Sequence, residues 1–320
     1  MSLRALPVES LFELARGGDR GALARLLSLV ERGGVEAREI GRIVYPASGG
    51  GYTVGLTGAP GAGKSTLTSA LIGHLRSGGE QVAVLAIDPS SPFTGGAILG
   101  DRVRMQDHAT DPGVFIRSMA TRGHLGGLSL ATPEAVRLLD AVGRRWILVE
   151  TVGVGQVEVE IAGKADTTVV VVNPGWGDSV QANKAGLMEI ADVFVINKAD
   201  RKGVEETRRD LEQMLELGDL GSDAWRPPIV SVVATEGKGI ESLWASVLSH
   251  RQFIESNGEL SRRRDFRLGE ELREIVARRL EQRAREITTG DRWVELQSQV
   301  SARTLDPWSA ADAMLGPVGA

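Results

Sequence analysis

The sequence predicts an α/β fold in which a doubly wound, mostly parallel sheet is flanked by N-terminal helices and followed by a C-terminal helical extension. Three observations support it: short apolar runs, helical segments that alternate with them, and a change of pattern at each end of the alternating region. The runs are apolar at consecutive positions, as in strands buried on both faces, and they are Thr53–Thr57, Val82–Ile87, Val114–Arg117, Trp146–Glu150, Thr168–Asn173, Val193–Asn197 and Ile229–Val233.

Helical segments separate these strands and extend beyond them at both ends of the chain. Those between the strands are Ser65–Arg76, Pro133–Val142, Val204–Leu217 and Ile240–Ser256. Near the N-terminus, Asp19 is placed to cap a helix with the apolar stripe Leu23, Leu26, Leu27 and Val30. After Ser256, one face of a long charged helix carries Leu268, Leu272, Ile275, Val276, Leu280 and Ile287. We expect a helical segment over 1–50, a central domain over 51–256, and an extension over 257–320 that packs back or pairs with another copy.

The composition is that of a globular protein, and it argues against nucleic-acid binding, cysteine-ligated metal sites and a membrane span. The 320 residues are 42% hydrophobic and 25% charged, and the formal net charge of −5 leaves no dominant basic stripe for nucleic acid. The short run Arg262–Arg264 is interpreted as a solvated loop. The absence of cysteine excludes disulfides, Cys-ligated zinc and iron–sulfur clusters. Without an apolar run of membrane length either, we expect a cytoplasmic protein with no membrane partner.

The strongest chemical signal is a glycine-rich segment between a strand and a helix. It has the P-loop pattern of glycine, four residues, glycine, lysine and serine, and reads Gly58, Ala59, Pro60, Gly61, Ala62, Gly63, Lys64, Ser65, with Thr66 next. Glycines let backbone N–H groups approach phosphate oxygens, and the helix N-terminus adds partial positive charge. We expect Lys64 to reach the β- and γ-phosphates and Ser65 to bind Mg²⁺.

A second signal, the tetrapeptide Asn197-Lys198-Ala199-Asp200, directly follows a predicted strand. The Asp200 carboxylate can accept hydrogen bonds from N1–H and the exocyclic amine of guanine, whereas adenine would leave that acceptor unpaired. Asn197 is expected to support the loop. Downstream, Val233 and Ala234 follow another strand and are placed to bring a backbone N–H to the guanine oxygen. The pattern therefore predicts GTP and GDP as ligands.

Acidic residues at strand ends complete a predicted Mg²⁺ site. Asp88 and Glu150 each end a strand, and the carboxyl ends of strands are where ligands gather in open α/β sheets. Asp101 lies after the loop 92–99 and could join when GTP is bound. The alternative for all three acids is a structural role such as helix capping.

Two further segments have features of switches. Gly153 is placed to sense the γ-phosphate through its N–H, and Gln156 could orient the attacking water or merely begin a helix. The loop Asn173–Lys184 contains two glycines and Trp176, so it either contacts a partner or simply connects a strand to a helix.

In combination these motifs resemble one family, the MeaB/ArgK GTPases, which are relatives of the human methylmalonic aciduria type A protein. The resemblance rests on Gly58–Ser65, Asn197–Asp200, Ile87-Asp88-Pro89-Ser90-Ser91, Gly100-Asp101-Arg102 and Glu150-Thr151-Val152-Gly153-Val154-Gly155-Gln156, and it covers nearly the whole chain. The P-loop alone would be unspecific, whereas the Asp-Pro-Ser-Ser and Glu-Thr-Val-Gly-Val-Gly-Gln segments are much more specific.

The resemblance implies a GTP-hydrolysing chaperone of adenosylcobalamin-dependent methylmalonyl-CoA mutase or a related acyl-CoA mutase, which gates cofactor loading and protects the mutase. It also implies a homodimer formed through the C-terminal extension. By the same resemblance, Gln181 and Lys184 are expected to couple the nucleotide state to the mutase, and Lys64, Asp101, Glu150 and Gln156 to act in hydrolysis.

Two alternatives remain at this point. The protein could be a GTP-dependent binding switch or a metallochaperone in which hydrolysis is incidental, although metallochaperones of this kind commonly carry Cys- or His-rich metal sites. It could also be an ATP-dependent kinase of a small molecule, as older names in the family imply, against which Asn197–Asp200 argues.

Overall fold

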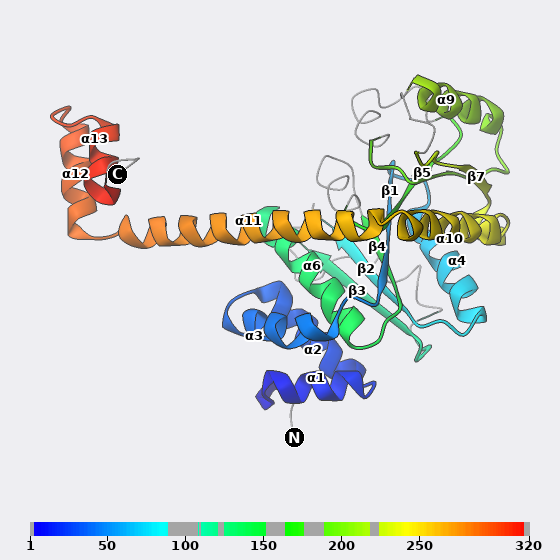
Figure 1. Ribbon diagram of the computed structural model, residues 1–320, viewed down its shortest axis with the longest axis horizontal. Helices are drawn as coiled ribbons and strands as arrows, with labels where there is room; N and C mark the ends of the chain where they lie inside the picture. Colours follow the sequence, from blue (N-terminus) through cyan, green and yellow to red (C-terminus); the bar gives the residue numbers. More distant parts are fainter. Residues whose placement is uncertain are drawn as a thin grey trace. The chain divides into compact units, whose positions relative to one another are not determined.

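The computed structural model describes residues 3–88, 108, 110–120, 125–151, 164–175, 189–217 and 224–316, with only the backbone described at 88, 120, 125–130 and 217. The chain forms two compact units, Met1–Arg264 and Asp265–Ala320 (Figure 1). The first unit contains the sheet, and the second consists of helices.

A seven-stranded sheet with the order β3-β2-β4-β1-β5-β6-β7 forms the centre of the first unit. All of its strand pairs are parallel. The strands are β1 Tyr52–Gly58, β2 Val82–Asp88, β3 Val114–Ala120, β4 Trp146–Thr151, β5 Thr167–Val172, β6 Val193–Asn197 and β7 Ile229–Val232. The predicted α/β class is therefore confirmed. Since β1 lies between β4 and β5, the strand order reverses at β1, where such sheets bind ligands.

Helices cover both faces of this sheet. Successive residues of each strand point to opposite sides, so each face carries apolar side chains that a layer of helices buries. Val82 and Val84 of β2 pack in one core with α4 (Lys64–Ser77) and α10 (Ile240–Ser256). Ala83 and Leu85 pack on the other side with α6 (Leu125–Ala141) and three N-terminal helices, α1 Val8–Arg16, α2 Arg20–Arg32 and α3 Val35–Val44. The helix α9 (Val204–Leu217) packs through Leu211 on Phe194 and Ile196. The fold is therefore doubly wound.

The helix α2 begins and packs as its sequence predicts. The Asp19 side chain accepts a hydrogen bond from the Ala22 N–H at 2.8 Å, which satisfies one of the free amides of the first turn. The apolar stripe Leu23, Leu26, Leu27 and Val30 is 2% exposed or less and belongs to the same core as strands β2, β3 and β4.

The helix α6 starts earlier than the sequence predicts. A start at Pro133 was expected, because proline lacks an N–H and is favoured in a first helical turn. In the structure Pro133 lies inside α6, which begins at Leu125. Ala135, Leu138 and Leu139 after it are fully buried, so their packing outweighs the lost hydrogen bond.

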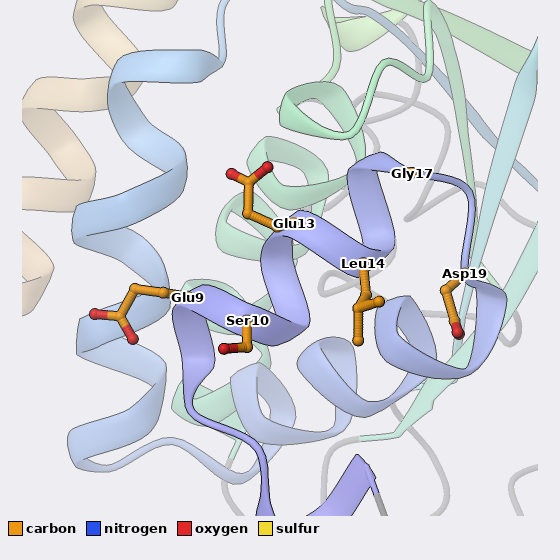
Figure 2. A pocket seen from close by; sticks show the side chains of 6 residues that line it. All are labelled: Glu9, Ser10, Glu13, Leu14, Gly17 and Asp19. Atoms are coloured by element: carbon orange, nitrogen blue, oxygen red, sulfur yellow. The ribbon is translucent and has the colours of Figure 1, made fainter. Parts of the chain in front are cut away.

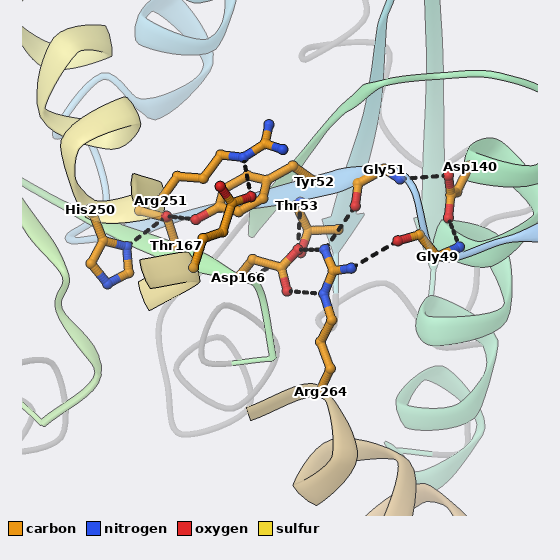
Figure 3. Close-up of polar contacts among 11 residues, drawn as sticks. Gly49, Gly51, Tyr52, Thr53, Asp140, Asp166, Thr167, His250, Arg251 and Arg264 are labelled. Atoms are coloured by element: carbon orange, nitrogen blue, oxygen red, sulfur yellow. Dashed lines mark hydrogen bonds and ion pairs between the residues drawn. The ribbon is translucent and has the colours of Figure 1, made fainter. Parts of the chain in front are cut away.

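A polar network at the amino end of the sheet corrects the interpretation of Arg262–Arg264 as a solvated loop (Figure 3). These residues lie in α11 (Glu259–Ile287). Arg264 donates through two nitrogens to the buried carboxylate of Asp166, at 3.0 and 2.6 Å, and also to the carbonyls of Gly49 and Gly51 at 3.0 and 2.8 Å. A bidentate pair of this kind fixes the start of the helix on the base of strands β1 and β5.

The neighbouring arginine makes a similar contact with a different strand. Arg263 Nη1 lies 3.1 Å from Asp192, just before β6, and Asp192 also lies 3.1 Å from Nε2 of the buried His250. The other ring nitrogen of His250 is 2.8 Å from the Thr167 hydroxyl, which is 2.7 Å from the Tyr52 hydroxyl. Burial raises the pKa of Tyr52, because a phenolate would lose its hydration there.

The second unit contains α11 beyond residue 264, α12 (Asp291–Ser301) and α13 (Pro307–Leu315). Asp306 caps α13 by accepting from the N–H groups of Trp308 and Ser309 at 2.9 and 3.0 Å. The apolar face predicted for the long helix is present and open to solvent: Leu268, Leu272, Ile275, Val276, Leu280 and Ile287 are 37–64% exposed. Over the described residues, none of the helices has the length and apolar character needed to span a lipid bilayer.

We predict that Arg264→Met lowers the free energy of unfolding by about 3 kcal/mol, because it leaves the Asp166 carboxylate buried without its cation. Urea denaturation followed by tryptophan fluorescence measures the change. Arg262→Met is the matched control, since Arg262 pairs with Glu259 at the surface, 69% exposed, and its loss should cost no more than about 1 kcal/mol. Equal unfolding midpoints for the two variants would contradict the structural role of Arg264.

Candidate nucleotide-binding site

The P-loop lies where the strand order reverses, between the end of β1 and the start of α4. Gly58 has φ of 138°, and a Cβ added to it would lie 1.9 Å from the carbonyl oxygen of Val171 on β5. Glycine is therefore required there by backbone conformation and by space. Gly63 precedes the helix with φ of 91°. This backbone and the first turn of α4 lie at the carboxyl edge of the sheet, where the N–H groups of a helix N-terminus favour an anionic ligand.

Lys64 is buried and lies along the loop that precedes it. Its ammonium donates to the carbonyl oxygens of Gly58 at 2.7 Å and Ala59 at 3.3 Å. The residue is only 8% exposed. A cation held over the P-loop backbone by carbonyl groups could contact the oxygens of a phosphate placed against that backbone.

Ser65 meets Glu150 at one end of the P-loop. The Ser65 hydroxyl donates to Oε1 of Glu150 at 2.6 Å, and both residues are buried. Glu150 is in register with Leu56 of β1 and with Ala86 of β2, so its carboxylate comes from the strand between them. A hydroxyl and a carboxylate in contact form an all-oxygen donor set, which is the ligand chemistry that Mg²⁺ prefers.

The remaining predicted ligands are only partly described. The strand β2 ends at Asp88, as expected, and the description of Asp88 stops at its backbone. Asp101 lies outside the described residues. Among the side chains that are described, no three or more His, Cys, Asp or Glu residues gather into a possible metal site. Ser65 and Glu150 fit Mg²⁺ and are the described residues that could hold it.

The base-reading loop is joined to the P-loop by one buried side chain. Asn197 ends β6 and is 2% exposed. Its amide nitrogen donates to the Ala62 carbonyl at 2.8 Å, and its amide oxygen accepts from the Ala234 N–H at 3.2 Å. Asn197 therefore connects the P-loop, the end of β6 and the segment after β7.

Lys198 and Asp200 follow on the surface. Lys198 has φ of 59°, uncommon for a residue with a Cβ, and its ammonium donates to the Gly61 carbonyl. Asp200 is exposed at the turn after β6, so its carboxylate is accessible to a ligand. Nearby, a hydrogen bond from Lys238 to Glu236 raises the pKa of Lys238, and Asp200 adds to that effect.

The other P-loop and base-loop candidates differ in exposure and pairing. Pro60 and Gly61 are exposed at the tip of the loop, Thr66 is half-buried in α4, and Val233 pairs with Lys238 in an isolated antiparallel bridge. Four further candidates lie outside the described residues: Gly153, Gln156, Gln181 and Lys184. Of the loop from 173 to 184, the structure describes Asn173, Pro174 and Gly175.

Sequence reasoning missed one residue at this site, Thr68, whose hydroxyl donates to Oε2 of Glu150 at 2.8 Å. Ser65 and Thr68 are three positions apart and so lie on one face of α4. That spacing is visible in the sequence, but a threonine within a helix is not by itself a functional signal.

A surface hollow of about 610 Å³ lies away from these motifs, on α1 and the turn into α2 (Figure 2). Its lining residues are Glu9, Ser10, Glu13, Leu14, Gly17 and Asp19. Asp19 is already engaged as the cap of α2. None of the P-loop or base-loop residues contributes to it, so it is separate from the nucleotide-binding site.

Comparison with known proteins agrees with this geometry. The family model described as "Methylmalonyl Co-A mutase-associated GTPase MeaB" matches residues 23–289. A protein of Pyrococcus abyssi is 53% identical over 313 residues, which cover 96% of each chain. The mouse protein named "Methylmalonic aciduria type A homolog, mitochondrial" is 34% identical over 277 residues, covering 80% of this chain and 66% of that protein. The solved structure titled "Crystal structure of LAO/AO transport system kinase" has a TM-score of 0.71 and 28% identity, covering 96% of each chain.

The parallel sheet, the P-loop at its switch point and the asparagine that joins it to the base loop define a P-loop GTPase. Within that class, the chain belongs to the MeaB family. The family resemblance seen in the sequence is therefore confirmed.

We predict that Asp200→Asn reduces the preference for GTP over ATP by about 10- to 100-fold, because a charged hydrogen-bond acceptor contributes about 1.5–3 kcal/mol. Competition of GTP and of ATP against a fluorescent GDP measures the preference. Asp210→Asn, which changes the same charge on α9, should leave it unaltered. An unchanged preference in the Asp200 variant would remove that carboxylate from base recognition.

Proposed function

We propose that the protein binds GTP together with Mg²⁺ and hydrolyses it to GDP and phosphate at the P-loop. The observation that carries this proposal is the bridge through Asn197, which links the phosphate-binding loop to the base-binding segment at Ala234. Through this bridge, one ligand with both a triphosphate and a guanine can engage both loops.

In the proposed reaction, water attacks the γ-phosphate and GDP leaves. The Lys64 ammonium and the N–H groups of the P-loop stabilise the charge that develops on the transferring phosphoryl group. Ser65, Glu150 and, by proposal, Asp88 and Asp101 would hold Mg²⁺, which neutralises charge on the β- and γ-phosphates when bound. Gln156 is proposed to orient the water. No arginine finger is assigned, so we expect slow turnover by the isolated protein.

The proposed partner is a cobalamin-dependent mutase. The family description names association with methylmalonyl-CoA mutase, and the mouse relative is named for methylmalonic aciduria. We propose that the nucleotide state gates adenosylcobalamin loading and protects methylmalonyl-CoA mutase or a related acyl-CoA mutase, with Gln181 and Lys184 as coupling residues. We also propose that the protein is a homodimer formed through residues 257–320, because the exposed apolar face of α11 would be covered by a second copy.

An ATP-dependent kinase of a small molecule remains a competing function, because a similar solved structure is titled a transport system kinase. The two functions differ in the phosphate acceptor. Hydrolysis releases inorganic phosphate into water, whereas a kinase transfers it to a small molecule. Recovery of the label from γ-³²P-GTP as free phosphate supports the GTPase, whereas recovery of the label from γ-³²P-ATP on an organic acceptor supports the ATP-dependent kinase.

We predict that Lys64→Ala lowers the rate of GTP hydrolysis by at least about 100-fold, because it removes a cation from the transition state. Phosphate release under saturating GTP measures the rate, and the thermal melting temperature checks that the fold is retained. Lys202→Ala, a change at an exposed lysine before α9, is the control. Turnover near that of the unaltered protein in the Lys64 variant would rule out the P-loop as the site of hydrolysis.

A second experiment tests the partner. We predict that a cobalamin-dependent acyl-CoA mutase from the same source accelerates GTP hydrolysis and has no effect on ATP hydrolysis. A mutase that binds the GTP form and leaves turnover unchanged would favour a binding switch, and one that neither binds nor stimulates would remove the mutase as a partner. Sedimentation of the protein alone tests the homodimer.

A further inference from the structure

We infer that Thr68 is a positioning residue that orients the Glu150 carboxylate for Mg²⁺, an inference that rests on the proposed Mg²⁺-dependent binding of GTP. Glu150 is 1% exposed at the end of β4. One of its oxygens accepts from Ser65 at 2.6 Å, and the other accepts from Thr68 at 2.8 Å. The two hydroxyl groups therefore fix the plane of the carboxylate as well as its position.

The placement of Thr68 follows from the geometry of α4. Residues three apart lie on one face of a helix, so the hydroxyl of Thr68 lies one turn beyond that of Ser65 on the side that faces β4. Thr68 is fully buried, and its branched Cβ restricts its rotamers. Its hydroxyl also lies 3.0 Å from the Lys64 carbonyl, a second acceptor within the helix. The shorter contact is to the carboxylate, which as a charged acceptor forms the stronger bond.

The two hydroxyl groups have different proposed roles. Ser65 is the residue proposed to bind the metal, and it contacts Oε1. Thr68 contacts Oε2 and lies one turn further along α4. Without Thr68, one oxygen of a buried carboxylate would lose a hydrogen-bond donor, and the group would turn or recruit another donor. Residues that orient a metal ligand in this way typically change metal affinity by about 10- to 100-fold when removed.

Thr68→Val tests the inference, because valine keeps the shape of threonine and removes its hydroxyl. The readout is the Mg²⁺ concentration that half-maximally slows release of a fluorescent GDP, measured by stopped flow with EDTA-buffered Mg²⁺. We expect this concentration to rise about 10- to 100-fold in Thr68→Val. We expect Thr68→Ser, which keeps the hydroxyl, to stay within about threefold of the unaltered protein.

A matched control comes from a second buried helical threonine. Thr132 of α6 is 7% exposed, and its hydroxyl finds no hydrogen-bond partner within the described part of the chain. Thr132→Val makes the same chemical change away from the P-loop and should not move the Mg²⁺ midpoint. The rate of GDP release in EDTA reports how tightly the protein holds GDP without metal, so it separates metal binding from nucleotide binding. Loss of the Thr68 hydroxyl should change that rate by no more than about twofold.

Each outcome bears on a different claim. A Thr68→Val midpoint equal to that of the unaltered protein overturns the positioning role and leaves the proposed function intact. Faster GDP release in EDTA, with an unchanged dependence on Mg²⁺, overturns it in favour of a packing role. A rise shared by Thr68→Ser shows that the methyl group matters rather than the hydroxyl, and also overturns it. If Mg²⁺ does not slow GDP release from the unaltered protein, the proposed Mg²⁺ site fails together with this inference.

Discussion

The carboxamide of Asn197 is the interaction on which the geometry of the nucleotide-binding site depends. It is buried at the end of β6, and it uses both its donor and its acceptor on backbone groups of two other segments. Loops at a sheet edge otherwise have few constraints, because they lack the ladder of hydrogen bonds that holds strands together. By joining the Ala62 carbonyl to the Ala234 N–H, this side chain fixes the distance between the surfaces proposed to bind phosphate and guanine. A loss of either bond would leave a buried polar group unpaired.

The sheet provides the support for that bridge. Its parallel strands present their carboxyl ends along one edge, so Gly58, Glu150 and Asn197 meet there although they are far apart in the chain. The opposite edge is held by ion pairs. Arg263 and Arg264, adjacent in α11, contact carboxylates that precede two neighbouring strands. The P-loop and the start of α11 therefore lie at opposite ends of the strands of this sheet.

Local patterns in the sequence predicted most of the fold and supplied the candidate residues of the site. Strands, the cap at Asp19 and the P-loop depend on neighbouring residues, so a short window contains the information. The pairing of Arg264 with Asp166 spans 98 positions, and a run of three arginines looks like any exposed basic segment until the fold brings it onto a buried acid. The start of α6 was misplaced because proline is typical of the first turn of a helix, whereas Pro133 lies inside this one. Thr68 was missed for the same reason as Arg264, since its partner Glu150 is 82 positions away.

The glycines of the P-loop differ in how strictly the structure requires glycine, so substitutions at them should have different effects on folding. At Gly58 an added Cβ would overlap the Val171 carbonyl. No residue with a side chain therefore fits there unless β5 moves away from β1. At Gly61 the backbone has φ of 70°, yet an added Cβ meets no atom within 4 Å. Asparagine and aspartate reach that conformation more easily than other residues. In a library that contains every substitution at both positions, we therefore expect no folded variant at position 58. At position 61 we expect few folded variants, chiefly asparagine and aspartate.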